Sequence, residues 1–532
     1  MRAAFVVLVL TVSWSSGTAA DTYPRQSAVD ALHYRFALTL AEQSASIDGE
    51  ATATFRILAP VASIELDLIE GAGNHGMKVT TVMLGSAPVA FTHANGRLRL
   101  PVPSGTRAGV ELSYTVTYGG TPADGLKMFT NMHGNRVMFS EGWPNRARHW
   151  LPMIDHPYDK ASVEMIVTAP SKWQVVSNGV LVEQVDVDDN RRRTHWKQSV
   201  PLPSWLFALG VARFDAHHAG TVQGVPLQTW AFPEDRAAAR ELFEDRSRRA
   251  MDFFAARVGP YPYEKLANVQ ASGFGGGMEN ATVIFYGEKG VAAGRAPVVH
   301  EIAHQWFGNS VTEHDWDDVW LSEGFATYFA LLYSEHFEGR DAFAMELARS
   351  REAILEAAQK LPETPVVHRN LSDMDRVLNT FVYQKGGWVL HMLRHEIGID
   401  NFWTGIREYY RRYRDGNASS DDLRNVMEMV SKRDLGPFFA QWLHRGDNPR
   451  IEATWSYHAS QRALDLTLRQ TQPGLPYSLS VDVDVVTPAE TRRETVRLDG
   501  PSATLTLKLD AAPSAVKIDP DTWLLADIAL RP

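Results

Sequence analysis

The segment His300-Glu-Ile-Ala-His304 is the most informative motif of this chain, together with Glu323 in Trp320-Leu-Ser-Glu-Gly-Phe-Ala326. On a helix, residues four apart lie one turn apart on the same face, so both histidines can reach one metal ion, with Glu301 beside them. Eighteen residues separate His304 from Glu323, and a carboxylate from a neighbouring helix would be the third ligand. The fourth tetrahedral position then stays open for water, as in catalytic zinc sites. We therefore predict one Zn²⁺ per chain, bound by His300, His304 and Glu323.

Glu301 is the predicted proton acceptor of this site. A zinc ion with one carboxylate ligand keeps a net positive charge, so it can acidify bound water and polarise a carbonyl. Fixed beside the metal, Glu301 can take a proton from water and return it to a leaving amine. The alternatives are a surface acid for Glu301 and a coincidental pairing of two surface histidines. His314 has no partner at ligand spacing, so we interpret it as a solvated loop histidine outside the site.

The composition is that of a multidomain globular protein. With 532 residues, of which 44% are hydrophobic and 22% charged, the chain is too long for a single core, and three domains are expected. The net charge of -10, with no basic block to offset it, argues against a nucleic-acid partner. Because the chain has no cysteine, a zinc site must use histidine and carboxylate ligands.

Residues 1–20 have the pattern of a signal peptide. Met1-Arg2 precedes an apolar run that ends at Trp14, and small residues follow up to Ala20. We expect cleavage near Ala20 and export to the periplasm or the exterior. The apolar run is short for a membrane span, and no later run approaches the roughly 20 residues that a membrane helix needs. We therefore predict no transmembrane segment.

The hydrophobic periodicity predicts a multidomain α+β fold. Residues 21–215 show period-two alternation and form an N-terminal β-sheet domain. Residues 216–448 form a mainly helical catalytic domain, with helices expected at 234–256, 341–360, 385–396, 402–413 and 421–431. Ser420 is placed to cap the last of these helices. Alternation returns in residues 449–532, which predicts a small C-terminal β-sandwich.

Further motifs resemble those of one family. Gly276-Gly-Met-Glu-Asn280, Trp306-Phe-Gly-Asn309 and Tyr383-Gln-Lys-Gly386 occur together with the zinc motifs in the order and spacing of the aminopeptidase N family of zinc exopeptidases, a gluzincin family. The segment 147–157 resembles the end of that family's N-terminal β domain. Taken alone, Gly273–Asn280 would be a flexible loop ending in a solvated acid, and Tyr383 a core aromatic residue at a helix start.

The resemblance implies a thermolysin-like catalytic domain and a role for each matching position. Glu279 would bind the substrate's free α-amino group, and Glu141 would join that cluster. Gly276 and Gly277 would hydrogen-bond the substrate backbone, and Met278 of the same motif is assigned to substrate binding. Tyr383 would donate its phenol to the oxyanion opposite the zinc.

The chain also departs from the family pattern. Gln384 stands where Glu is usual, and Met153 where Cys is frequent. Many relatives continue into a large helical domain that caps the active site, whereas this chain is expected to lack it, which predicts a more open cleft. Asp317 or Asp318 either orients a ligand histidine or caps a helix.

The predicted function is that of an exported zinc aminopeptidase acting on peptides with a free N-terminus. A thermolysin-like endopeptidase, which shares H-E-x-x-H, is the closest alternative. A catalytically inactive scaffold is disfavoured by the intact ligands, Glu301 and Tyr383. Epoxide hydrolysis, known within the family, could use Asp375, but a surface loop acid explains that residue more simply.

Overall fold

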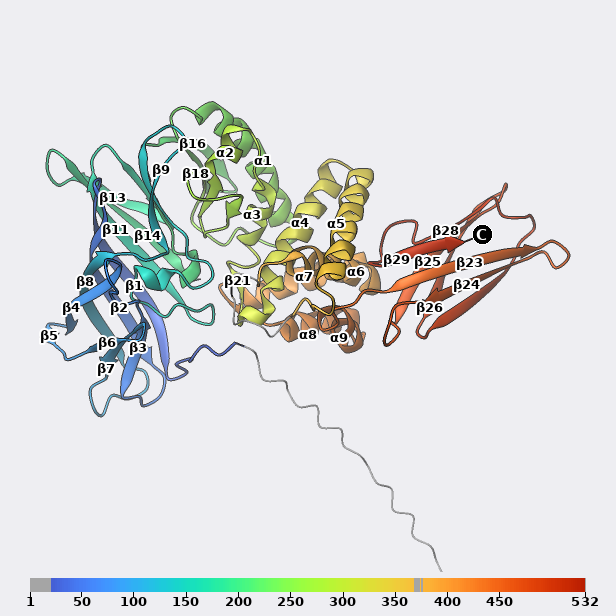
Figure 1. Ribbon diagram of the computed structural model, residues 1–532, viewed down its shortest axis with the longest axis horizontal. Coiled ribbons are helices and arrows are strands. Elements are labelled where there is room, and N and C mark those ends of the chain that lie inside the picture. Colours follow the sequence, from blue (N-terminus) through green and yellow to red (C-terminus); the bar gives the residue numbers. More distant parts are fainter. Residues whose placement is uncertain (1–20, 368–373, 375–376, 532) are drawn as a thin grey trace, which may run out of the picture.

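The computed structural model describes residues 21–531, apart from 368–373 and 375–376. The expected signal peptide, residues 1–20, and Asp375 lie outside the described residues. Figure 1 shows three regions along the long axis: N-terminal strands, a largely helical middle and C-terminal strands. This order agrees with the predicted succession of a β-rich region, a helical region and a second strand region.

The N-terminal region is built on a large sheet whose strands alternate between buried and more exposed residues, as β1 shows along its length. Its strand order is β13 (Val180–Asp186), β14 (Arg191–Pro203), β11 (Lys160–Pro170), β1 (Val29–Ala41), β2 (Ser44–Ile57), β8 (Glu111–Thr121), β4 (Gly76–Leu84) and β5 (Ala87–Pro88). Two smaller sheets contain β12 (Gln174–Ser177), β15 (Leu209–Ala212), β10 (Arg136–Ser140) and β9 (Leu126–Thr130), and β3 (Ser63–Asp67), β7 (Arg97–Pro101) and β6 (Thr92–Ala94). The 3₁₀ helices η1 (Ala147–His149) and η2 (Ser204–Leu206) complete the region.

The middle region begins with a five-stranded sheet, where helices were expected to dominate. Its order is β16 (Asp215–Val222), β17 (Val225–Ala231), β18 (Leu266–Ala271), β20 (Val283–Gly287) and β19 (Gly277–Met278). The strands β18 and β20 are buried at every residue, so they lack the alternation that marks a half-exposed strand. Both pair in parallel with a neighbour, which is typical of fully buried strands. The short strand β19 forms the edge of this sheet.

The helices of the middle region are α1 (Arg236–Arg257), α2 (Glu288–Ala292), α3 (Val298–His304), α4 (Trp320–Phe337), α5 (Arg340–Lys360), α6 (Gly386–Ile397), α7 (Ile399–Tyr413), α8 (Ser420–Ser431) and α9 (Gly436–Leu443). Five of them, α1, α5, α6, α7 and α8, agree with the predicted ranges to within a few residues. Shorter elements are β21 (Val311–Glu313), η3 (Trp316–Asp318), the π-helix η5 (Phe381–Lys385) and β22 (Gly416–Ala418).

The residue that caps α8 differs from the prediction. Ser419, not Ser420, is the N-cap, because its hydroxyl accepts a hydrogen bond from the Asp422 backbone N–H at 3.2 Å. The Asp422 carboxylate accepts from the Ser419 N–H in return, which completes a capping box. Ser420 is the first helical residue, and its hydroxyl donates to Asp318 instead.

The C-terminal strands form two sheets with an apolar interior. One has the order β27 (Ser502–Lys508), β24 (Ala463–Gln470), β23 (Arg450–His458) and β29 (Asp527–Arg531), and the other β26 (Thr491–Leu498), β25 (Leu479–Val486) and β28 (Ala515–Ile518). Alternate residues of β24 and β25, such as Leu466 and Val483, are fully buried, in agreement with the alternation seen in the sequence.

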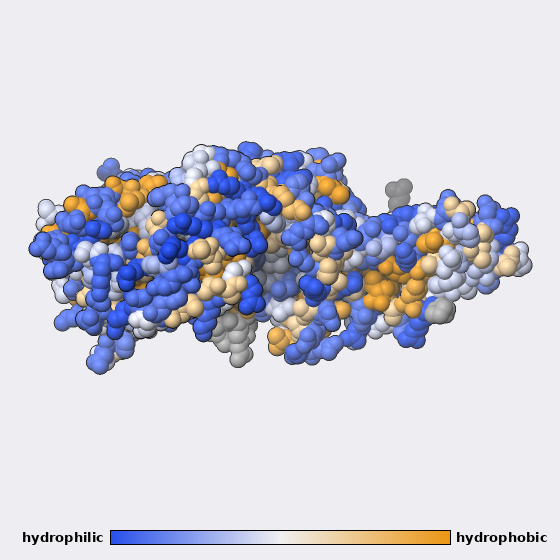
Figure 2. Space-filling view, turned by 90° about the horizontal axis from the view of Figure 1, so that it is seen from above, coloured by the Kyte–Doolittle hydropathy of each residue, from blue (hydrophilic) through white to orange (hydrophobic). Residues whose placement is uncertain are grey.

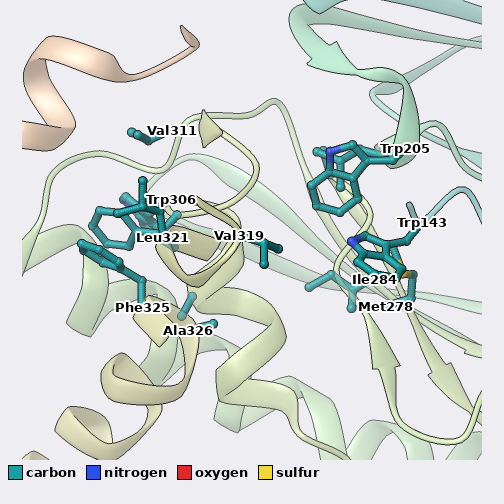
Figure 3. Packing of buried hydrophobic residues seen from close by; sticks show 14 of the residues in the cluster. Trp143, Trp205, Met278, Ile284, Trp306, Val311, Val319, Leu321, Phe325 and Ala326 are labelled. Atoms are coloured by element: carbon teal, nitrogen blue, oxygen red, sulfur yellow. The ribbon is translucent and has the colours of Figure 1, made fainter. Parts of the chain in front are cut away.

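Large aromatic side chains join the N-terminal region to the helices. Trp316 of η3 lies 5.7 Å from Trp143 and 6.2 Å from Trp205, measured between ring centroids. Figure 3 shows part of the surrounding hydrophobic cluster, which includes Trp306 and Phe325 of the helical region. This packing fixes the start of α4, which follows η3 directly, against the N-terminal region.

The face of the molecule seen in Figure 2 is largely hydrophilic, and apolar residues gather on it in a few places. Among the residues that the structure describes, no helix is long and apolar enough to cross a membrane.

Candidate active site

The helix α3 brings the two histidines of the sequence motif together. It begins at Val298, directly after Pro297, because a residue before proline, here Ala296, disfavours helical backbone. His300 and His304 lie one turn apart on this helix, and their Nε2 atoms are 3.1 Å apart. Two imidazole nitrogens at this distance need a proton or a cation between them.

The helix α4 supplies the third predicted ligand from its first turn. The Oε2 atom of Glu323 lies 3.4 Å from Nε2 of His300 and 3.3 Å from Nε2 of His304. This oxygen is buried and has no hydrogen-bond partner among the described residues. A buried carboxylate oxygen without a donor is costly unless a cation neutralises it.

The spacing of these three atoms suits a single metal ion. Two ligand atoms of a tetrahedral centre lie about 3.3 Å apart when both bonds are about 2.0–2.1 Å long. The observed separations are 3.1, 3.3 and 3.4 Å. His300, His304 and Glu323 therefore form a group that could hold a metal ion, as the sequence spacing predicts.

Neighbouring groups orient the ring of His304. Its Nδ1 lies 3.2 Å from the carbonyl oxygen of Phe307 and 3.1 Å from Oγ of Ser322. A donor bond from Nδ1 to the carbonyl leaves Nε2 free to bind a metal. Neither partner was predicted from the sequence. Asp318, one of the two residues considered for this role, accepts hydrogen bonds from the backbone and hydroxyl of Ser420 at the start of α8.

Two further carboxyl groups are buried beside the ligands. Glu301 is 5% exposed and Glu279 is 6% exposed. Burial raises the pKa of Glu301 well above its usual range, and the nearby Glu279 adds to the rise. Burial likewise raises the pKa of Glu279 to about 7. A dication at the ligand group would favour the ionised form of both carboxyls.

An open cleft of about 750 Å³ gives access to these groups. It is lined by residues in and beside β19, and by residues of α3, α4 and η5. They include Gly276, Gly277, Glu279, His300, Glu301, His304, Glu323, Thr327, Ser334, Tyr383 and Gln384. The cleft follows α4 from Glu323 to Ser334, a distance of about 16 Å at 1.5 Å per residue. It therefore has room for an extended chain of several residues.

Tyr383 lies on the π-helix η5, whose geometry is often associated with functional sites. Its ring is stacked with that of His300, with centroids 6.0 Å apart. Burial and the carboxylate of Glu323 raise the pKa of Tyr383, so the phenol keeps its proton and can donate it in a hydrogen bond.

A contact between two glycines sets the position of this tyrosine. A Cβ atom on Gly324 of α4 would lie only 2.8 Å from the carbonyl carbon of Gly386, at the start of α6. The absence of side chains lets α4 approach the Tyr383 segment closely. This contact was not predicted from the sequence, because the two glycines are 62 residues apart.

Two of the predicted substrate-binding residues, Glu141 and Met278, are not among the residues that line the cleft. The Glu141 carboxylate forms an ion pair with Arg146, and it lines a smaller adjoining cavity with Phe139 and Phe274. It is still close enough to contribute to the raised pKa of Glu279. The Met278 side chain is 6% exposed and belongs to the hydrophobic cluster. Substrate contacts by Glu141 and Met278 stay predictions.

Comparison with known proteins assigns this arrangement to a family. Residues 30–206 match the peptidase M1 N-terminal domain, and residues 244–442 match the peptidase family M1 domain. The chain belongs to peptidase family M1. This confirms the resemblance seen in the sequence motifs, and the M1 domain match contains Tyr383 and the three residues that could hold a metal ion.

Several M1 aminopeptidases are similar to the chain. Human glutamyl aminopeptidase is 28% identical over 372 residues, which is 65% of this chain and 38% of that protein. Aminopeptidase N of Streptomyces lividans is 26% identical over 450 residues, which is 78% of this chain and 51% of that protein. The matched part of the chain thus spans between about two fifths and a half of these M1 relatives' length.

Proposed function

We propose that the protein is a zinc aminopeptidase that hydrolyses the first peptide bond of peptides with a free N-terminus. The observation that carries the proposal is the buried carboxyl of Glu279, which lines the same cleft as the three ligand residues. A buried carboxylate there is left unpaired until an ammonium group arrives. The site would therefore favour the end of a chain over its middle. The M1 relatives named above are all aminopeptidases.

Each residue of the site has a role in this proposal. Glu279 accepts hydrogen bonds from the α-ammonium group and so places the first peptide bond beside the ligand residues. Glu301 takes a proton from the attacking water and returns it to the departing amine. Tyr383 donates its phenol to the carbonyl oxygen as negative charge develops there. A zinc ion held by His300, His304 and Glu323 would supply a Lewis acid that activates water and polarises the carbonyl.

The first expected result concerns the metal. Purified protein should contain about one zinc per chain, because three ligand atoms at tetrahedral spacing define one site. The His304→Ala variant should lose most of this zinc when dialysed at neutral pH, and inductively coupled plasma mass spectrometry would measure the loss. His314→Ala, which removes an exposed histidine, is the control and should retain the metal. Full zinc occupancy in His304→Ala would show that the ligands are wrong.

The second expected result tests the aminopeptidase proposal itself. Acetylating the N-terminus of a fluorogenic peptide should lower kcat/KM by about thirtyfold or more, since a charge-assisted hydrogen-bonded contact worth about 2 kcal/mol is lost. Both substrates would be assayed with and without a chelator. Mass spectrometry of the products would show where each peptide is cut.

Internal cleavage of the acetylated peptide at a comparable rate would contradict this proposal. That outcome would favour the endopeptidase alternative, in which Glu279 does not select an amine. No cleavage of either peptide by the zinc-loaded protein would favour the inactive scaffold.

A further inference from the structure

We propose that Lys160, on the first position of β11 in the N-terminal region, is a positioning residue for Glu279 and thereby sets the recognition of the substrate's amino group. This inference rests on the proposed function, since it assigns that recognition to Glu279. Lys160 does not line the cleft. It acts through the segment that follows α3.

The Lys160 ammonium group is held by three backbone carbonyl groups of the helical region. Its Nζ donates to the carbonyl oxygens of Asn309 at 3.1 Å, Ser310 at 2.9 Å and Gly416 at 2.8 Å. An ammonium group has three donors and no acceptor, so these carbonyls use its whole hydrogen-bonding capacity. Burial lowers the pKa of Lys160 to about 7, and the nearby carboxyl groups of Asp415 and Glu313 oppose that fall.

Asn309 carries this contact to Glu279. Its side-chain Nδ2 donates to the backbone carbonyl oxygen of Glu279 at 2.7 Å, and Gln305 donates to the same oxygen at 2.9 Å. Asn309 is fully buried, so bulk solvent does not reach its amide to replace a lost partner. Lys160 fixes the backbone of Asn309, and the Asn309 side chain fixes the backbone that bears the Glu279 carboxyl.

Lys265 offers a matched comparison within the same chain. It lies just before β18 in the middle region and donates across the same junction to the N-terminal region. Its acceptors are the carbonyl oxygens of Ser177, at 2.6 Å, and Gly179. Like Lys160, it joins the two regions through an ammonium group on backbone carbonyls. Its ammonium group contacts neither Glu279 nor Asn309 among the described residues, so its removal should weaken the junction without moving Glu279.

The test measures amine recognition separately from turnover. An amino-acid hydroxamate and its N-acetyl form both bind a metal through the hydroxamate, but only the first carries an ammonium group. Their inhibition constants would be measured on zinc-loaded wild type, Lys160→Met and Lys265→Met. The free-amine inhibitor should bind to Lys160→Met at least about fivefold more weakly than to the wild type. The acetylated inhibitor should bind equally well to both proteins. Lys265→Met should show the wild-type ratio of the two inhibition constants, although its loss of thermal stability should be comparable to that of Lys160→Met.

A double-mutant cycle checks the route through Asn309. If Lys160 acts through Asn309, the effects of Lys160→Met and Asn309→Ala on the ratio of inhibition constants should not add. The inference would be overturned if Lys160→Met kept the wild-type ratio of inhibition constants, or if the effects of the two substitutions were additive. If Lys160→Met does not fold, Lys160→Gln, which keeps a polar end but not three donors, carries the same expectation. A wild-type enzyme that binds both inhibitors equally would instead contradict the proposed role of Glu279.

Discussion

Replacing Glu301 with glutamine should lower kcat by about a thousandfold while the protein keeps its metal, because general acid–base catalysis contributes about 10²–10⁴-fold. Glutamine has nearly the shape of glutamate, but its amide cannot take a proton from water. Glu301 is not among the three ligand residues, although it lies on the same helix. The measurements are kcat with a free-amine peptide and the zinc content of the same preparation.

Tyr383→Phe provides the comparison for this variant. It removes a hydrogen-bond donor and leaves the proton acceptor in place, so kcat should fall by about a hundredfold with zinc retained. If Glu301→Gln kept a wild-type rate at full zinc occupancy, another group would have to be the base. If it lost zinc together with activity, the separation of metal binding from proton transfer would be wrong.

The ligand group could be predicted from the sequence because its geometry is largely local. His300 and His304 are related by a single helical turn, which places both side chains on one face of α3, with their Nε2 atoms 3.1 Å apart. Glu323 was placed by its spacing and by its position near the start of a second helix. The family assignment followed from short motifs in a fixed order, and the domain matches confirm it.

The supporting contacts could not be predicted, because they join distant parts of the chain. Lys160 reaches carbonyl groups of residues about 150 positions later, and no local pattern marks such a pair. Gly324 and Gly386 pack together only after α4 and α6 have formed. The buried strands β18 and β20 were missed for a different reason, because burial on both faces removes the alternation on which strand prediction relies.

The predicted amine site differs from the structure in the ion pairing of one of its two carboxylates. The sequence placed Glu141 beside Glu279 by resemblance alone. In the structure its carboxylate is paired with Arg146, so part of its charge is already neutralised. Among the described residues, Glu279 forms no ion pair with an arginine or lysine, and its favourable charge interaction is with His304 of the ligand group. It is therefore the principal candidate for the ammonium group.

Replacing Gly277 with alanine should lower kcat/KM by about a hundredfold, because misplacing a catalytic group by about 1 Å can have that effect. A Cβ atom on Gly277 would lie 2.3 Å from both Cδ and Oε1 of Glu301. A Cβ atom does not approach an unbonded heavy atom so closely, so the Glu301 carboxyl must move. It is the end of a flexible side chain, and the displacement should leave zinc binding and the melting temperature nearly unchanged.

Gly275→Ala is the matched control for this prediction. A Cβ atom on Gly275 would meet no atom within 4 Å, although the residue lies in the same glycine-rich stretch. A loss of activity confined to Gly277→Ala would therefore come from the added methyl group in the cleft and not from a stiffer backbone. Equal losses in both variants would indicate that flexibility of the stretch matters instead. An unchanged rate in Gly277→Ala would show that the observed position of the Glu301 carboxyl is not the one that catalysis requires.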